Sequence, residues 1–335
     1  MELNQLFCDG LILQANKPVR VFGTGTGTAT VAIGGKTATV QASGETWLAE
    51  LPTFDYGGPY ILEVDMNGER QTVRDVYFGD VYLLSGQSNM QMKLDETNTP
   101  TSYYASNPDL RLFSTDRVFE DEDYFHARDG WVKADEKTVA HWSALGYLSA
   151  KILNEKTGRK IGLIACYQGA AMIQSWLPKG ILLGTDCAEA AEENSLDMRN
   201  PDYLAWNMDG NLYSAQFATL LPFSLKAVLW YQGESNTRLP DAPLYRGMLE
   251  MLIRRWRKDL LDEKLDFVVM QLANLFVPFI DQECWQTVQT AQERISQEME
   301  NVHTVKCADF SETDNIHPVT KLPLAERIAA VLLTV

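Results

Sequence analysis

Ser88 is the first residue whose type and position suit it to chemistry. It stands in the segment GQSNM (86–90), at the end of the apolar run VYLLSG (81–86). A serine at a turn from strand to helix has a free hydroxyl that can act as a nucleophile, and its backbone N–H can help to hold an oxyanion. A helix N-cap is the alternative interpretation. Met90 stands where the G-x-S-x-G motif has its second glycine, which disfavours a standard α/β-hydrolase.

His317 is the histidine, among four in the chain, that acidic residues flank in a polar loop, DNIHP (314–318). The carboxylate of Asp314, three residues earlier, is placed to accept the Nδ1 proton, which leaves Nε2 to face a serine. A lone histidine is more often structural. Because Asp314 and Ser88 occur in the same chain, we interpret His317 as a general base.

Glycines and amide side chains follow two further apolar runs. Gly169 comes soon after the run at 161–166, and the segment QGESN (232–236) follows the run at 227–231. Glycine N–H groups and the NH₂ groups of Gln or Asn are suitable oxyanion donors. Tight turns and ordinary loop hydrogen bonds are the alternative interpretations. Glu234 lies beside these amides, but no second carboxylate stands out as its partner for glycosidase chemistry.

Composition and charge narrow the function further. The sequence has no HExxH, no His/Cys cluster and no CxxC pair, so we expect no metal and no organic cofactor. Five scattered cysteines, and the absence of a signal-like or membrane-length apolar segment, favour a cytoplasmic protein. A net charge of −16 disfavours nucleic acid and anionic membranes as partners, and it leaves neutral ligands such as sugars.

Two regions with different periodicity must position these residues. Short runs rich in Val, Ile and Thr within residues 10–74 are typical of a small antiparallel sandwich. Beyond residue 75, apolar strand-like runs alternate with helix-like stretches, which predicts a doubly wound sheet whose chemistry lies outside the strand carboxyl ends. We therefore predict an N-terminal β-sandwich domain, residues 1–74, and an α/β domain, residues 75–335. The expected strands are 81–86, 161–166, 227–233 and 266–273, and the expected helices are 143–156, 244–260 and 285–300.

Four segments resemble the blocks of the SGNH-hydrolase superfamily, in the branch of sialate O-acetylesterases and related carbohydrate acetylesterases: GQSNM (86–90), residues 169–176, WYQGESN (230–236) and DNIHP (314–318). The similarity extends to residues 6–23, 45–60 and 76–92, and so covers nearly the whole chain. It implies a three-layer α/β/α, flavodoxin-like catalytic domain with a parallel sheet. It also implies hydrolysis of O-acetyl esters on carbohydrates through an acetyl-serine intermediate.

The resemblance also implies roles for the residues of the triad and the oxyanion hole. Ser88 matches the nucleophile, His317 the general base and acid, and Asp314 the residue that orients the imidazole. The N–H groups of Ser88 and Gly169 match two donors of the oxyanion hole.

A side-chain amide is expected as the third donor. Gln232 is the better positional match and Asn236 is the alternative, while Glu234 is expected to support the loop from behind. The second block departs from the family pattern, because residues 169–171 read Gly-Ala-Ala where relatives usually have Gly-Gly-Thr.

The expected partner is an acetylated mono- or oligosaccharide, and the oligomeric state is left open. An acetyl-xylan type of substrate is one alternative, and a non-catalytic carbohydrate-binding protein on the same fold is another. Sialic acid carries a carboxylate and would require an arginine near the site, for which Arg111, Arg117 and Arg238 are the candidates.

Overall fold

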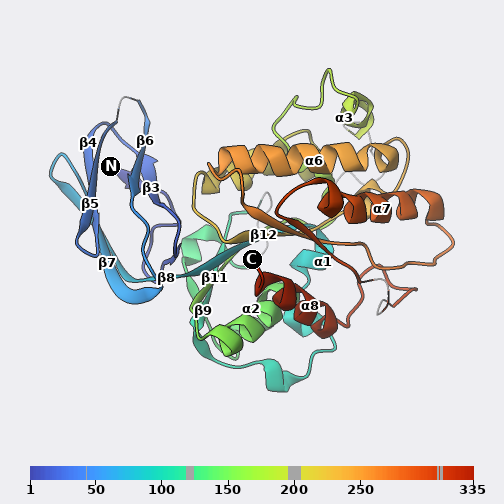
Figure 1. Cartoon of the computed structure of the whole chain (residues 1–335), viewed down its shortest axis with the longest axis horizontal. Coiled ribbons are helices and arrows are strands. Elements are labelled where there is room, and N and C mark those ends of the chain that lie inside the picture. The colour runs from blue at the N-terminus through green and yellow to red at the C-terminus, as the bar shows by residue number, and fades with distance from the viewer. Residues whose placement is uncertain (43, 118–123, 195–204, 308, 310–311) are drawn as a thin grey trace.

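The computed structural model describes residues 1–42, 44–117, 124–194, 205–307, 309 and 312–335. It is a mixed α/β fold in which a group of N-terminal strands adjoins a larger, mostly parallel sheet with helices (Figure 1). None of the helices in these ranges is long and apolar enough to span a bilayer.

The N-terminal strands pair mainly in antiparallel fashion. Strand β3 lies between β1 and β6, while β4 lies between β5 and β7, and β7 pairs with the first part of β8. In β4 the buried residues Ala29, Val31 and Ile33 alternate with less buried ones, as the period of a half-buried strand requires. The bounds are β1 (Glu2–Leu3), β2 (Ile12–Gln14), β3 (Val19–Thr24), β4 (Gly27–Ile33), β5 (Lys36–Ala42), β6 (Thr46–Leu51), β7 (Gly57–Met66) and β8 (Glu69–Gly86).

Strand β8 belongs to both groups of strands. Its first part pairs with β7, residues 77–79 pair with β2, and residues 80–86 run parallel to β11. The expected boundary between residues 74 and 75 therefore falls inside one continuous strand. The division into domains 1–74 and 75–335 stays a prediction.

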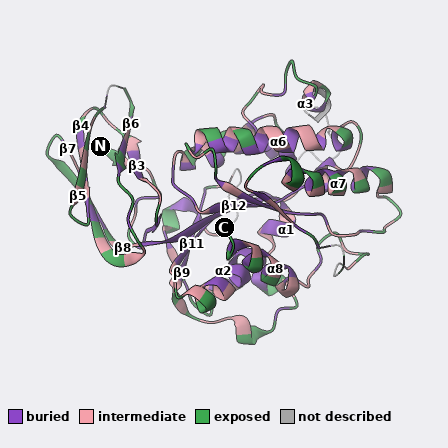
Figure 2. Ribbon diagram, viewed as in Figure 1, coloured by how far each residue is buried: buried purple, intermediate pink, exposed green. Residues whose placement is uncertain are grey.

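The main path of the larger sheet has the order β10-β9-β11-β8-β12-β13-β14, and all pairs along this path are parallel except β9 with β10. All four expected strands are confirmed at their cores, because each overlaps β8, β11, β12 or β13. Every residue of β11 and β12 is buried, as expected for parallel strands covered on both faces (Figure 2). The bounds are β9 (Asn107–Ser114), β10 (Val132–Ala134), β11 (Ile161–Tyr167), β12 (Ala227–Tyr231), β13 (Asp266–Met270) and β14 (Val302–Val305).

The long helices lie beside this sheet. In Figure 1, α6 and α7 lie on one side of the strands and α2 and α8 on the other, and each pair is in contact. Helix α2 begins after Ser143, whose Oγ accepts a hydrogen bond from Gly146 N, and it ends at the left-handed Gly158. The three expected helices are confirmed as α2, α6 and α7.

The helices are α1 (Ser88–Gln91), α2 (Ala144–Thr157), α3 (Ala188–Asn194), α5 (Asn211–Ala215), α6 (Asp241–Asp259), α7 (Gln282–Glu298) and α8 (Leu322–Leu332). Short 3₁₀ turns are η1 (Leu94–Glu96), η2 (Thr101–Tyr103), η3 (Ala127–Asp129), η4 (Thr138–His141), η5 (Ile173–Trp176), η6 (Phe217–Leu220) and η7 (Glu234–Asn236).

Candidate active site

Ser88 lies where the central strand β8 ends and the chain turns into α1. Gly86, the last residue of β8, has φ 124°, and a Cβ at this position would overlap the carbonyl of Tyr231 on β12. Only glycine allows this close approach of the two strands. The first helical N–H groups have no intrahelical acceptor, so the Ser88 N–H is available to a substrate oxygen.

His317 reaches Ser88 from the loop between β14 and α8, although 229 residues separate the two in sequence. Its Nε2 lies 2.7 Å from Ser88 Oγ, and its backbone N–H donates to Asn315 Oδ1 at 2.9 Å. Burial, and then the positive charge of Lys321, lower the pKa of His317, while Glu96 on η1 opposes the shift. The imidazole is therefore neutral at neutral pH and able to accept the serine proton.

Asp314 is exposed at the start of the DNIHP segment. Within the described part of the chain, no hydrogen bond joins its carboxylate to His317, and the carboxylate that acts on the pKa of His317 is that of Glu96. The structure therefore brings Ser88 and His317 together, but in the described ranges it shows no hydrogen bond from either residue to Asp314. The role of Asp314 stays a prediction.

Gly169 lies beside the nucleophile after β11. A Cβ built on it would lie 3.8 Å from the Cβ of Ser88. Its N–H donates to Gln91 Oε1 at 2.6 Å, and Gln91 in turn donates from Nε2 to Tyr124 Oη at 2.8 Å. The Gly169 N–H, which is a proposed oxyanion donor, is thus bonded to the side-chain oxygen of Gln91 in this structure. Gln91, one turn along from Ser88, is a site residue that the sequence reasoning missed.

Ala170 stands where the second block departs from the family pattern. It adopts φ 54°, a left-handed conformation in which glycine is favoured and which a non-glycine residue adopts at some cost. Asn207 supports this turn, because it donates to Ala170 O at 2.9 Å and accepts from Met172 N at 2.8 Å.

The two amides expected in the oxyanion hole lie in a buried network. Gln232 Nε2 donates to Asn236 Oδ1 at 2.7 Å and to Ala171 O at 3.0 Å, and it lies 3.2 Å from Gln87 Oε1. Asn236 Nδ2 lies 2.8 Å from Gln174 Oε1 and 3.2 Å from Asp241 Oδ2. Both NH₂ groups therefore have internal acceptors, and neither has a free N–H for a substrate in this arrangement.

Glu234 lies behind the nucleophile, as expected for a supporting residue. Its Oε1 accepts from Asn89 Nδ2 at 2.6 Å, and burial raises the pKa of Glu234. Asn89 Oδ1 in turn accepts from Lys321 Nζ at 2.7 Å. The sequence reasoning missed both contacts. Asn89 could have been found from its place inside GQSNM, whereas nothing in the sequence marks Lys321.

The three candidate arginines have different surroundings. Arg111 is buried and donates to the Gly10 carbonyl and, at 2.9 Å, to Asp75 O, in the part of the molecule where β8 passes from the N-terminal strands to the parallel strands. Arg238 Nε lies 3.9 Å from Asp241 Oδ2. Arg117 Nη2 lies 3.2 Å from both Gln91 Oε1 and Gln168 Oε1, so Arg117 is the arginine bonded to residues beside Ser88.

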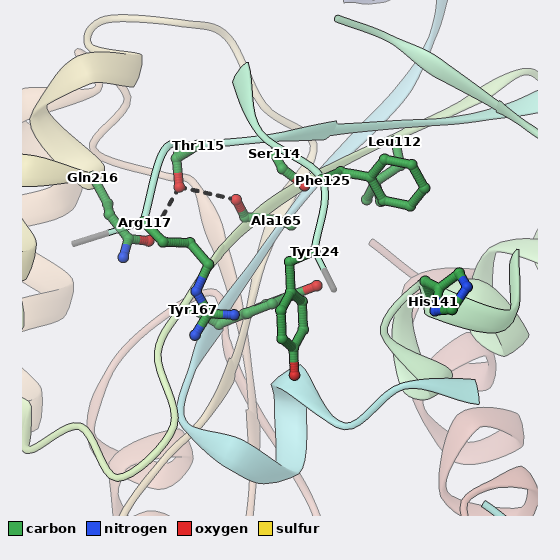
Figure 3. Close-up of a pocket in the computed structure, with 10 residues that line it drawn as sticks. All are labelled: Leu112, Ser114, Thr115, Arg117, Tyr124, Phe125, His141, Ala165, Tyr167 and Gln216. Carbon is green, nitrogen blue, oxygen red and sulfur yellow. Dashed lines mark hydrogen bonds between the residues drawn. The ribbon is translucent and has the colours of Figure 1, made fainter. Parts of the chain in front are cut away.

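A small pocket adjoins Arg117. Figure 3 shows its guanidinium next to the ring of Tyr124, with 4.2 Å between the guanidinium carbon and the ring centroid. Arg117 Nη1 is buried without a hydrogen-bond partner in the described ranges. No three His, Cys, Asp or Glu side chains gather there or elsewhere in these ranges as metal ligands would.

The sequence and the fold of this chain are similar to those of known proteins. Residues 78–333 match the family model for carbohydrate esterases described as sialic acid-specific acetylesterases. Over 240 residues, the chain is 31% identical to sialate O-acetylesterase of Pongo abelii and 30% identical to that of Homo sapiens; each match covers 67% of this chain and 44% of the relative. The chain thus spans less than half the length of these curated relatives. A carbohydrate acetylesterase from Xanthomonas citri superposes with a TM-score of 0.83 at 30% identity, covering 98% of this chain and 73% of that chain.

Proposed function

We propose that this chain, which belongs to the carbohydrate esterase family of sialic acid-specific acetylesterases, removes O-acetyl groups from sugars. The 2.7 Å contact between Ser88 Oγ and His317 Nε2 carries the proposal. A serine paired with a neutral imidazole at the carboxyl end of a parallel sheet is the arrangement that acyl transfer requires. A packing role for either side chain would not require this pairing.

In the proposed reaction, Ser88 Oγ attacks the acetyl carbonyl carbon while His317 Nε2 takes the hydroxyl proton. The tetrahedral oxyanion binds the N–H groups of Ser88 and Gly169, after the Gln91 amide oxygen has left Gly169. The C–O bond to the sugar then breaks, and His317 returns the proton to the sugar oxygen. Water, deprotonated by His317, then attacks the acetyl-serine carbonyl carbon. The bond from that carbon to Ser88 Oγ breaks, His317 returns the proton to Oγ, and acetate is released.

The third oxyanion donor and the residue that orients His317 are also proposals. Gln232 becomes the third donor if its Nε2 releases the Ala171 carbonyl oxygen and donates to the substrate oxygen instead. Asn236 is the alternative third donor. Asp314 is proposed to orient the imidazole. The motif spacing supports this role, and no hydrogen bond to another residue in the described ranges competes for its carboxylate.

Arg117 bears on which sugar is bound. Its guanidinium donates hydrogen bonds to two glutamine side-chain oxygens, and no carboxylate pairs with it in the described ranges. An acidic sugar such as an O-acetylated sialic acid would supply that carboxylate. Acetylated xylo-oligosaccharides, which are neutral, are the alternative substrate class.

Acetate release from O-acetyl sialic acid and from acetylated xylo-oligosaccharides distinguishes the two classes. We expect the acidic sugar to be preferred, and we expect Arg117→Met to raise its KM by about tenfold or more while leaving p-nitrophenyl acetate hydrolysis nearly unchanged. If the two sugars have equal KM values with the wild-type enzyme, and Arg117→Met changes neither value, the assignment to sialic acid is contradicted. Failure to hydrolyse p-nitrophenyl acetate at all would favour the carbohydrate-binding alternative.

Two further features are part of the proposal. The architecture is a three-layer α/β/α esterase domain preceded by a β-sandwich, with helix pairs α2/α8 and α6/α7 as the outer layers.

All five cysteines have free thiols, which supports a reducing compartment such as the cytoplasm.

A further inference from the structure

Three polar side chains lie buried behind the pair formed by Ser88 and His317. Lys321, Asn89 and Glu234 are 1%, 2% and 9% exposed. Lys321 Nζ donates to Asn89 Oδ1 at 2.7 Å, and Asn89 Nδ2 donates to Glu234 Oε1 at 2.6 Å. The same Nδ2 donates to the carbonyl oxygen of Ile316 at 2.9 Å. Asn89 therefore has all its amide hydrogen-bonding groups in use, and we call these three side chains the Asn89 array.

The array joins the two halves of the proposed catalytic pair. Asn89 follows Ser88 in the chain, and Ile316 precedes His317. The bond from Asn89 Nδ2 to Ile316 O thus ties the turn of the nucleophile to the loop of the base. Lys321 and Glu234, from opposite sides, fix the orientation of the amide that makes this bond.

Packing alone does not explain the composition of the array. A buried ammonium group and a buried carboxyl group are costly, and apolar residues of similar volume would stabilise the fold as well or better. Here the neutral Asn89 amide links the two groups, and Glu234 Oε2 is buried without a partner in the described ranges. Burial lowers the pKa of Lys321 to about 8 and raises that of Glu234.

We propose that Lys321, Asn89 and Glu234 are positioning residues that hold the His317 loop against the Ser88 turn and keep a positive charge behind the base. This inference rests on the proposed esterase function. It assigns a role to the asparagine of GQSNM and the glutamate of QGESN, and it adds Lys321.

The charged groups around the array determine the sign of the expected pH effect. Lys321 faces Glu234, Cys307 and Glu312 as well as His317. His317 faces the cation of Lys321 and, on the other side, the carboxylate of Glu96. Because a nearby cation disfavours the imidazolium form, removing Lys321 raises the pKa of His317. The acid limb of the pH profile of kcat/KM then moves to higher pH.

The test uses Lys321→Met and Asn89→Ala, with p-nitrophenyl acetate as substrate. For Lys321→Met, we expect the acid limb to move up by about half a unit to one unit. For Asn89→Ala, we expect kcat to fall by about 10²-fold with KM nearly unchanged, because the base loses its alignment. Lys258→Met, which removes an exposed lysine of α6, is the matched control and should change neither quantity.

Titration of the His317 imidazole by NMR in wild type and in Lys321→Met measures the same shift without turnover. An unmoved imidazole pKa in Lys321→Met, together with a kcat for Asn89→Ala within about threefold of wild type, would overturn the proposal. If a variant does not fold, Asn89→Asp retains the acceptor for Lys321 but loses the donors to Ile316 and Glu234, and the same fall in kcat is expected. An active Ser88→Ala enzyme would instead refute the esterase function itself.

Discussion

Strand β4 of the N-terminal part alternates buried and less buried residues, whereas every residue of β11 and β12 in the parallel sheet is buried. The polar residues of the two regions differ accordingly. On the exposed face of β4 and β5, polar side chains pair with each other, as in the 2.7 Å bond from Thr28 Oγ1 to Gln41 Oε1. In the parallel sheet they are buried just beyond the strand ends, as Gln232 is.

The difference indicates where chemistry is located. Exposed threonine pairs can be exchanged at little cost, because water satisfies the groups that remain. Buried amides and carboxyls at strand ends depend on other protein groups for their hydrogen bonds, so their positions are precise. Precise positions of polar groups are what a catalytic site requires.

The largest expected effect is the loss of activity on substitution of Ser88, and its absence would contradict the contrast between the two regions. Ser88→Ala should lower kcat by about 10³-fold or more, because the nucleophile is lost. Thr39→Ala, in the exposed face of β5, is the control and should leave kcat unchanged. Kinetics with p-nitrophenyl acetate measure both, and a Ser88→Ala enzyme with a tenth of wild-type activity would show that the nucleophile lies elsewhere.

The two buried amides offer a sharper test. Gln232→Ala and Asn236→Ala should both lower the Tm, because each leaves buried groups without partners. Gln232→Ala alone should also lower kcat by about 10²-fold with KM nearly unchanged, as expected for loss of an oxyanion donor. Melting curves and kinetics on the two variants provide the measurement. The reverse pattern would assign the donor role to Asn236.

The pH dependence follows from the lowered pKa of His317. The neutral imidazole accepts the serine proton, so activity is lost as the pH falls through this pKa. Because burial and Lys321 lower the pKa, we expect the acid limb of kcat/KM to lie below the ordinary histidine value of about 6.5. An acid limb above 7, in protein that regains full activity after return to neutral pH, would contradict this assignment.

The smallest effect is expected in the N-terminal strands. Arg70 Nε lies 2.9 Å from Asp65 Oδ2 on the surface, where water screens the pair. Arg70→Ala should leave kcat unchanged and shift the Tm by about 1–2 °C at most. A larger loss of activity would mean that this region contributes to the site, contrary to the comparison above.

Local pattern was sufficient to predict four strands and three helices of the α/β part. Apolar runs of strand length predicted the cores of β8, β11, β12 and β13, and periodic stretches predicted α2, α6 and α7, because burial imposes these patterns on short segments. The rule that chemistry follows the strand ends also led to Ser88, and the structure places it against His317. The continuity of β8 was not predictable, because its residues change from partly exposed to fully buried along the strand, and such a change has the same sequence pattern as a boundary between two elements.

The partners of the polar groups depended on the tertiary structure. Residue types and spacing indicated that Gln232, Asn236 and Asp314 could serve the site. They did not show that both amides bond within the network, or that no hydrogen bond joins Asp314 to His317 in the described ranges. Likewise, Gln91 occupies Gly169 N–H and Lys321 reaches Asn89. A side chain bonds to whatever acceptor packing brings within about 3 Å, and that distance depends on every element between the two residues.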